Sequence, residues 1–91
     1  MSECREFEGI VRSLDLAERG LELTLNTSKG QEKVVLSVTG VSSEFDLIPY
    51  QMALKGNRVV AKMFDDSVYV SELAVLSGRL RDTRYTARRY D

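Results

Sequence analysis

The chain has 91 residues, 43% of them apolar, and this length suits one small domain but not two. It contains no His and a single Cys, Cys4, which excludes His-based catalytic triads, imidazole metal sites and an internal disulfide. Thirteen Lys and Arg face fourteen Asp and Glu, for a net charge of −1, so the chain as a whole is not a polycation.

The N-terminal residues 1–6 are mostly polar and carry two acidic side chains and one basic one. A secretory signal requires roughly 7–15 apolar residues behind a basic start, and a membrane-spanning helix requires about 20. Neither pattern occurs in the chain. We therefore expect a soluble cytoplasmic protein without a membrane partner, with the nucleus as an alternative intracellular location.

The first half of the chain alternates apolar and polar residues, the pattern of half-buried strands. A first strand is expected over 7–16, where Gly9 indicates a bulge or a sharp bend. Alternation over 21–25 and 34–38 predicts a second and a third strand. The Gly and Ser in 27–31 predict a hairpin connection between them.

The next segment lacks this alternation. Ser43 and Asp46 have the spacing of a helix capping pair. Because Pro49 is poorly tolerated inside a helix, we expect a short turn at 43–48 and then a helix that opens at Pro49 and stops at Gly56. The side chains expected to plug the open end of a barrel, as core rather than as a ligand pocket, are Phe45, Ile48, Met52 and Leu54.

Two further strands are expected in the second half. Alternation over 58–64 predicts a fourth strand, 65–67 is a polar turn, and 68–75 returns as the fifth. Glu72 interrupts the alternation of that last strand and indicates a bulge or a strand end near it.

Five strands with a helix between the third and fourth, and the segment Leu54-Lys55-Gly56-Asn57-Arg58-Val59 leading into the fourth, resemble the OB-fold. That fold is a five-stranded Greek-key barrel that binds oligonucleotides or oligosaccharides. The resemblance covers residues 5–76 and is architectural. It implies an all-β barrel domain over 1–78, although SH3-like and other short barrels would give a related pattern.

A barrel that binds single strands needs aromatic platforms for bases and cations for phosphates. The outward positions of the second and third predicted strands hold no aromatic side chain. The acidic turn at 65–67 would repel phosphate. The residues that could instead form a basic side of the barrel are Arg12, Arg58 and Lys62, with Phe64 or Tyr69 as a stacking surface; alternatively these are solvated strand residues and core aromatics.

Charge is distributed unevenly along the chain. Residues 1–78 carry eight basic and twelve acidic side chains, a net of −4, whereas the tail 79–91 carries five basic and two acidic ones, a net of +3. The basic and aromatic residues of the tail are Arg79, Arg81, Arg84, Tyr85, Arg88, Arg89 and Tyr90. A helix capped by Ser77 would place Arg81, Arg84 and Arg88 on one face.

Three interpretations of this tail stay open. It could dock on a partner or on the barrel itself, contact nucleic acid through interleaved Arg and Tyr, or serve as a flexible solubilising end.

Other chemistry has little support in the sequence. Asp65 and Asp66 with Glu72 fit a turn better than a metal site, Cys4 has acidic neighbours that disfavour a thiolate, and no Gly-rich phosphate loop occurs. We therefore expect no enzyme activity, no catalytic residues, no metal and no cofactor. Two functions remain. The first is a module that binds single-stranded DNA or RNA, or that is a subunit of a nucleic-acid-related complex. The alternative is a protein–protein adaptor without nucleic-acid contact. A protein partner or a homo-oligomer is expected in either case.

Overall fold

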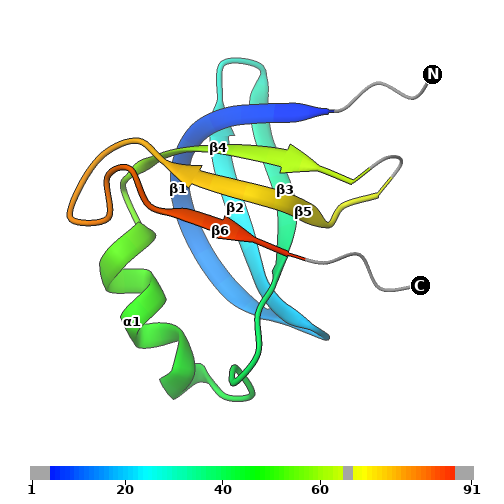
Figure 1. Cartoon of the computed structure of the whole chain (residues 1–91), viewed down its shortest axis with the longest axis vertical. Helices are drawn as coiled ribbons and strands as arrows, with labels where there is room; N and C mark the ends of the chain where they lie inside the picture. The colour runs from blue at the N-terminus through cyan, green and yellow to red at the C-terminus, as the bar shows by residue number, and fades with distance from the viewer. Residues whose placement is uncertain (1–4, 65–66, 88–91) are drawn as a thin grey trace.

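A computed structural model describes residues 5–64 and 67–87, which form six strands and one helix (Figure 1). The elements are β1 (Glu6–Ala17), β2 (Gly20–Thr27), β3 (Gly30–Ser37), α1 (Glu44–Leu54), β4 (Arg58–Met63), β5 (Val70–Val75) and β6 (Arg84–Thr86). The strands make one antiparallel sheet in the order β3-β2-β1-β4-β5-β6. The all-β prediction is confirmed, and β1 to β5 are the five strands that alternation predicted. The helix of this described part is too short to cross a membrane.

Strand β1 is long because it pairs along both edges, with β4 over residues 6–10 and with β2 over residues 9–17. Gly9 belongs to both pairings, opposite Thr27 on one side and Val59 on the other. A Cβ atom at Gly9 would overlap the carbonyl oxygen of Asn26, so the close approach of β2 requires glycine here. The expected irregularity lies three residues further on, where the register with β2 shifts at Arg12.

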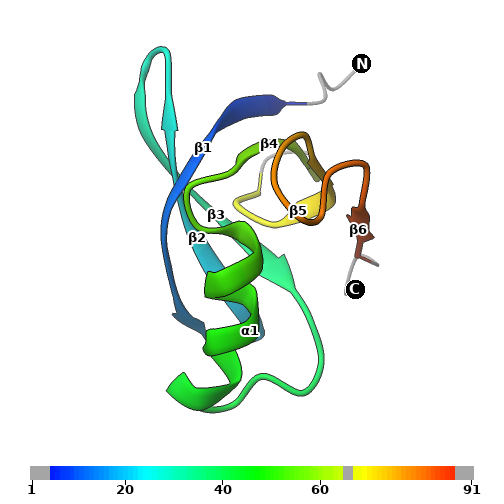
Figure 2. The same ribbon diagram turned by 90° about the vertical axis from the view of Figure 1, so that its left-hand side faces the viewer.

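The concave side of the sheet holds the core, and helix α1 packs against β1 at one end of it (Figures 1 and 2). Alternation places every second side chain of β2 and β3 inside. The core side chains with the least solvent exposure are Val11, Leu21, Leu23, Leu25, Val34, Leu36, Leu54, Val59, Val70, Leu73 and Val75.

Helix α1 begins at Glu44, so the prediction that residues 43–48 form a turn and that the helix opens at Pro49 is wrong. The capping pair explains the earlier start: the backbone N–H of Ser43 donates to Oδ2 of Asp46 at 3.1 Å. Pro49 lies inside the helix and is exposed. Its missing N–H leaves only the carbonyl of Phe45, an exposed residue, without its helical partner, and water can serve that carbonyl.

Strand β6 was not expected. The prediction of a helical tail that places Arg81 and Arg84 on one face is wrong, because residues 79–82 form a turn and residues 84–86 pair with β5. Positive φ angles at Gly78 and Asp82 reverse the chain before β6. Leu80 and Tyr85 then pack against the core, and this burial favours the strand over a solvated helix.

The expected five-stranded barrel is not confirmed, because the sheet stays open. Closure would require β3 and β5 to pair, whereas within the described residues the one bridge at this point is a parallel one between Val35 and Tyr69, the residue just before β5. The edge of β5 that faces away from β4 pairs with β6 along residues 71–75. There the N–H of Val75 donates to the carbonyl of Thr83 at 2.9 Å. The tail therefore takes the edge that a closed barrel would use.

Candidate binding surfaces

The outward face of β4, β5 and β6 brings together three of the basic residues selected from the sequence. We call this surface the charged sheet face and define it by Arg58, Lys62, Glu72 and Arg84. Lys62 Nζ lies 3.6 Å from Glu72 Oε2, and Arg84 Nη1 lies 3.3 Å from Glu72 Oε1. Arg58 Nη1 pairs with Glu8 Oε2 of β1 at 3.3 Å. Sequence reasoning placed Arg58 and Lys62 on one side, and their positions on β4 agree with that.

Glu72 organises this face, whereas the sequence singles it out only as an interruption of the alternation and as a disfavoured metal ligand with Asp65 and Asp66. The register shift between Lys62 and Met63 leaves Ser71 as an extra residue of β5, which is the bulge expected beside Glu72. Lys62 lies opposite Glu72 on β4, while on β6 the residue opposite Glu72 is Thr86 and Arg84 is two residues before it, on the same face of the sheet. Only the strand register reveals this triad, so the signal could not come from local sequence.

The charged sheet face is balanced rather than strongly basic. A hollow there is lined by Val60, Lys62, Glu72, Ala74 and Arg84. Two cations share one carboxylate, so the triad has a net charge of +1, while the Arg58–Glu8 pair is neutral. Surface ion pairs contribute only about 0–1 kcal/mol, so a phosphate could compete for these cations, but both carboxylates would oppose it.

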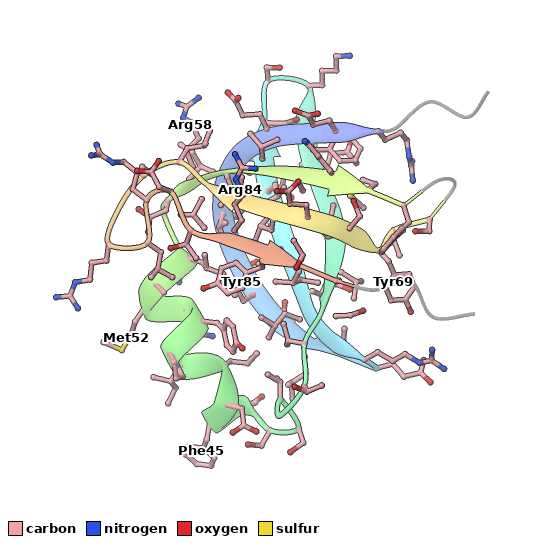
Figure 3. All side chains as sticks on the ribbon, viewed as in Figure 1. Phe45, Met52, Arg58, Tyr69, Arg84 and Tyr85 are labelled. Atoms are coloured by element: carbon pink, nitrogen blue, oxygen red, sulfur yellow. The ribbon has the colours of Figure 1, made fainter. Side chains whose placement is uncertain are left out.

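The remaining basic and aromatic candidates do not gather around this face. Arg79 and Arg81 are exposed in the turn before β6, and Arg81 Nε lies 4.0 Å from the carboxylate of its neighbour Asp82. Arg12 is exposed at the irregularity of β1. Tyr69 lies beside Val35 at the end of β5 remote from Arg58 (Figure 3). The tail residues Arg88, Arg89 and Tyr90 lie outside the described residues, as does the predicted Arg88 position on a helical face.

Tyr85 of β6 is partly buried, and its ring points toward helix α1 rather than toward the charged sheet face (Figure 3). Burial raises the pKa of Tyr85, and the neighbouring phenol of Tyr50 acts in the same direction. Tyr50 and Tyr85 both pack against the core. Tyr85 therefore fastens β6 to the domain and offers little free ring surface for a base.

The outward face of β2 and β3 is polar and lacks an aromatic residue of its own. Its charges pair across the strands, with Lys33 Nζ 3.9 Å from Glu22 Oε1. The bridge between Val35 and Tyr69 does add one aromatic residue at the edge of β3. A single edge tyrosine provides one stacking position, which is less than the row of platforms that single-strand binding uses.

Helix α1 exposes a stripe of apolar side chains, which we call the α1 stripe and define by Phe45, Ile48 and Met52. Their exposed fractions are 81%, 48% and 74%. The spacing i, i+3, i+7 puts them on one helical face, and in Figure 3 Phe45 and Met52 point away from the sheet. The prediction that these three residues plug a barrel is wrong. Leu54 is the one residue of the predicted plug that is buried. Leu47, which was not part of that prediction, is also buried.

An open hollow lies between α1 and β1, next to this stripe. Its apolar lining includes Leu14, Leu47 and Ile48, and its charged lining consists of Asp15 and Glu44. None of the lining residues is basic. Moreover, the chain has no Lys or Arg between Lys33 and Lys55, so α1 and the segment leading to it carry only negative charge. The α1 stripe thus borders an acidic hollow.

The position of the α1 stripe depends on the helix cap at Asp46. Its carboxylate accepts hydrogen bonds from the backbone N–H groups of Ser42 at 3.0 Å and Ser43 at 3.1 Å. The hydroxyl of Ser43 adds a third at 3.2 Å. These bonds, the Ser42 and Ser43 backbone donors foremost, lower the pKa of Asp46 below its ordinary value.

Because the folded pKa is depressed, the ionised Asp46 stabilises the fold at pH values above the ordinary aspartate pKa of about 3.9. This contribution is lost as the pH falls through the lower folded pKa. We expect Asp46→Asn to lower the melting temperature at pH 7, and the gap to the native protein to narrow below pH of about 4. Thermal unfolding of both proteins, followed by circular dichroism at pH 7 and below pH of about 4, measures this difference in melting temperature. A gap that widens on acidification would contradict this assignment, and Glu6→Gln, at the start of β1, is the charge-matched control.

Carboxylates and the single thiol are the side chains of this chain that could bind a metal ion. Among the residues that the structure describes, no group of three or more Cys, Asp or Glu side chains could hold a metal ion. Cys4, Asp65 and Asp66 lie outside the described residues.

Comparison with known proteins found no matching family model, no matching curated protein and no matching solved structure.

Proposed function

We propose that this chain is a non-enzymatic, cytoplasmic binding module of OB-like topology that acts as a protein–protein adaptor within a larger assembly. The α1 stripe is its protein contact. The observation that carries the proposal is the exposure of Phe45, Ile48 and Met52 on one face of a helix whose other face is buried.

The OB-like assignment is supported by the order of the elements. Strands β3-β2-β1-β4-β5 are consecutive in the sheet, α1 lies between β3 and β4, and the bridge between Val35 and Tyr69 brings the two ends of this set together. An OB-fold is itself a partly open barrel. In this proposal β6 is an addition to the edge of β5.

A protein partner is favoured by the kind of residues exposed. Contiguous exposed apolar patches mark interaction sites, whereas apolar residues exposed singly are normal on protein surfaces. Aromatic residues and Met are enriched in the centres of protein interfaces. A single-stranded nucleic acid would instead need unpaired cations and stacking rings, whereas Arg58, Lys62 and Arg84 have carboxylate partners.

Single-stranded DNA or RNA binding is the second candidate function, and one observation favours it. Arg79 and Arg81 are exposed in the turn before β6, close in the chain to Arg84, at the start of the basic tail. An adaptor in a nucleic-acid-related assembly could use this end while the α1 stripe contacts protein.

Site-specific photo-crosslinking in the native cells separates the two candidates. The photoreactive residue benzoylphenylalanine replaces Phe45 in one variant, Arg79 in a second, and Gln31 of β3, an exposed residue remote from both, in a control. We expect a protease-sensitive adduct from position 45 that position 31 does not give. Phe45→Ser should then weaken binding of the purified, identified protein by about 30-fold, because interface hot spots contribute about 2 kcal/mol or more.

Two results would overturn the adaptor proposal. One is the absence of any protein adduct from position 45. The other is a nuclease-sensitive adduct from position 79 combined with an unchanged affinity of the Phe45→Ser variant for every protein that crosslinks.

A further inference from the structure

We infer that the element which seats on the α1 stripe is a basic amphipathic helix of the partner protein. The inference rests on the proposed adaptor function and deepens it by naming the chemistry of the partner. Its basis is the combination of an exposed apolar stripe and a hollow beside it whose charged lining residues, Asp15 and Glu44, are both acidic and form what we call the acidic rim.

The geometry favours a helix lying alongside α1. From Phe45 to Met52 the α1 stripe rises by seven residue steps, which at about 1.5 Å per step is about 10 Å. A second helix presents apolar side chains with the same repeat of i, i+3 or i+4, and i+7, so its ridge can follow the stripe and enter the hollow between α1 and β1. Leu14, Leu47 and Ile48 supply the apolar wall of that hollow.

The charges specify the flanks of this partner helix. Asp15 and Glu44 line the hollow, and none of its lining residues is basic. Lys or Arg residues beside the apolar ridge of the partner would therefore meet opposite charge at the rim. Such pairs contribute chiefly to specificity and to the rate of association.

The same charges disfavour two other occupants. A lipid surface with anionic headgroups would be repelled by the acidic rim. A second copy joined through this face by two-fold symmetry would set one acidic rim against another. Neither alternative brings the positive charge that the rim calls for.

The test is an NMR titration of the isotopically labelled full chain with designed helical peptides. One peptide of about 15 residues, long enough to form a helix, has Leu on one face and Lys on the other. The second keeps the Leu positions and replaces every Lys with Glu. We expect the Lys peptide to shift the backbone amide signals of 14–15 and of 44–52 other than Pro49, which has no amide proton, and the Glu peptide to bind at least about 10-fold more weakly.

Matched variants locate the effect. Asp15→Asn with Glu44→Gln removes the two rim charges and should weaken the Lys peptide about 3- to 10-fold. Glu6→Gln with Glu32→Gln removes two charges from β1 and β3 away from the hollow and should leave its affinity unchanged. Phe45→Ser should abolish the shifts at 44–52 while the rest of the spectrum shows that the protein remains folded.

The results that overturn the inference differ from those that overturn the adaptor function. Equal binding of the Lys and Glu peptides at α1 would refute the basic partner and leave an apolar protein contact standing. Shifts on another face, or none with either peptide, would also refute the basic helix, and the crosslink from position 45 judges the adaptor function independently.

Discussion

Removal of residues 79–91 is expected to lower the free energy of unfolding by roughly 3–5 kcal/mol. This is a large part of the roughly 5–15 kcal/mol that stabilises a domain of this size. Leu80 and Tyr85 leave the core, and the backbone bonds from Val75 to Thr83 and from Ala87 to Ser71, both 2.9 Å, are lost. The sheet then ends at β5, whose core side chains Leu73 and Val75 would be partly exposed.

The truncation also creates a new sheet edge. With β6 gone, residues 71–75 of β5 present unpaired N–H and C=O groups beside apolar side chains, and such an edge pairs readily with another chain. Urea unfolding should show a midpoint lower by about 2 M, and size-exclusion chromatography should show oligomers. The control is Arg79→Ser with Arg81→Ser in the full chain, expected within about 0.5 kcal/mol of the native protein. An unchanged midpoint in the truncated chain would contradict the packing of β6.

This result decides how nucleic-acid binding by the tail should be tested. A truncated chain that loses binding could have lost its fold rather than its phosphate contacts. Replacing all five tail Arg residues with Ser keeps Tyr85 and the backbone of β6. Within the described residues, the one ion pair with another strand that it removes is the exposed pair of Arg84 with Glu72, which contributes about 0–1 kcal/mol. If those five residues met single-strand phosphates, the slope of log affinity against log salt would flatten by about 3.5.

Strands were predictable because their signal is local. Alternation along each of β1 to β5 reflects one buried and one exposed face, and that pattern is complete within each segment. Even the bulge beside Glu72 is visible in the sequence, since adjacent Ser71 and Glu72 interrupt the alternation of the fifth strand. The elements that depend only on their own side chains were therefore found.

The face of helix α1 that packs inward was not predictable in the same way. Its sequence holds two apolar stripes, Phe45-Ile48-Met52 and Leu47-Tyr50-Leu54, and both have helical spacing. Only the direction from which α1 meets β1 decides which stripe is buried. The candidate site was missed for this reason: residues expected in the core are the ones that the structure exposes.

The tail illustrates a competition between local and distant interactions. Residues 79–91 contain no alternating run that would mark a strand, and Arg-rich segments are good helix formers. The open edge of β5 and the apolar surface near Tyr50 nevertheless offer backbone partners and burial that an isolated helix lacks. Likewise, the pairing of Lys62 and Arg84 with Glu72 joins three strands, so it exists only once the register is set.

Gly9→Ala is expected to destabilise the fold by about 2–3 kcal/mol, the upper part of the range for overpacked sites. The added methyl group would overlap the carbonyl oxygen of Asn26 and lie 2.9 Å from its carbonyl carbon. Backbone atoms cannot swing aside as a side chain does. Because β2 is also paired with β3 along its other edge, relief requires both strands to move.

The matched control is Gly30→Ala in the β2–β3 turn. A Cβ atom there has nothing within 4 Å, so its cost comes only from the φ angle of 122° and should be about 1 kcal/mol. Thermal unfolding should place Gly9→Ala at least about 8 °C below the native protein. Equal melting temperatures for the two variants would show that β1 and β2 do not approach so closely at Gly9.

Gly9 has a further importance because β1 is the strand that joins the two halves of the sheet. β2 and β3 lie on one side of it, β4, β5 and β6 on the other, and both pairings of β1 pass through Gly9. Separating β1 from β2 at this point would loosen both halves. Hydrogen exchange of the Gly9→Ala variant should therefore show lower amide protection in both β2 and β4. A defect confined to the pairing of β1 with β2 would lower the protection of β2 alone.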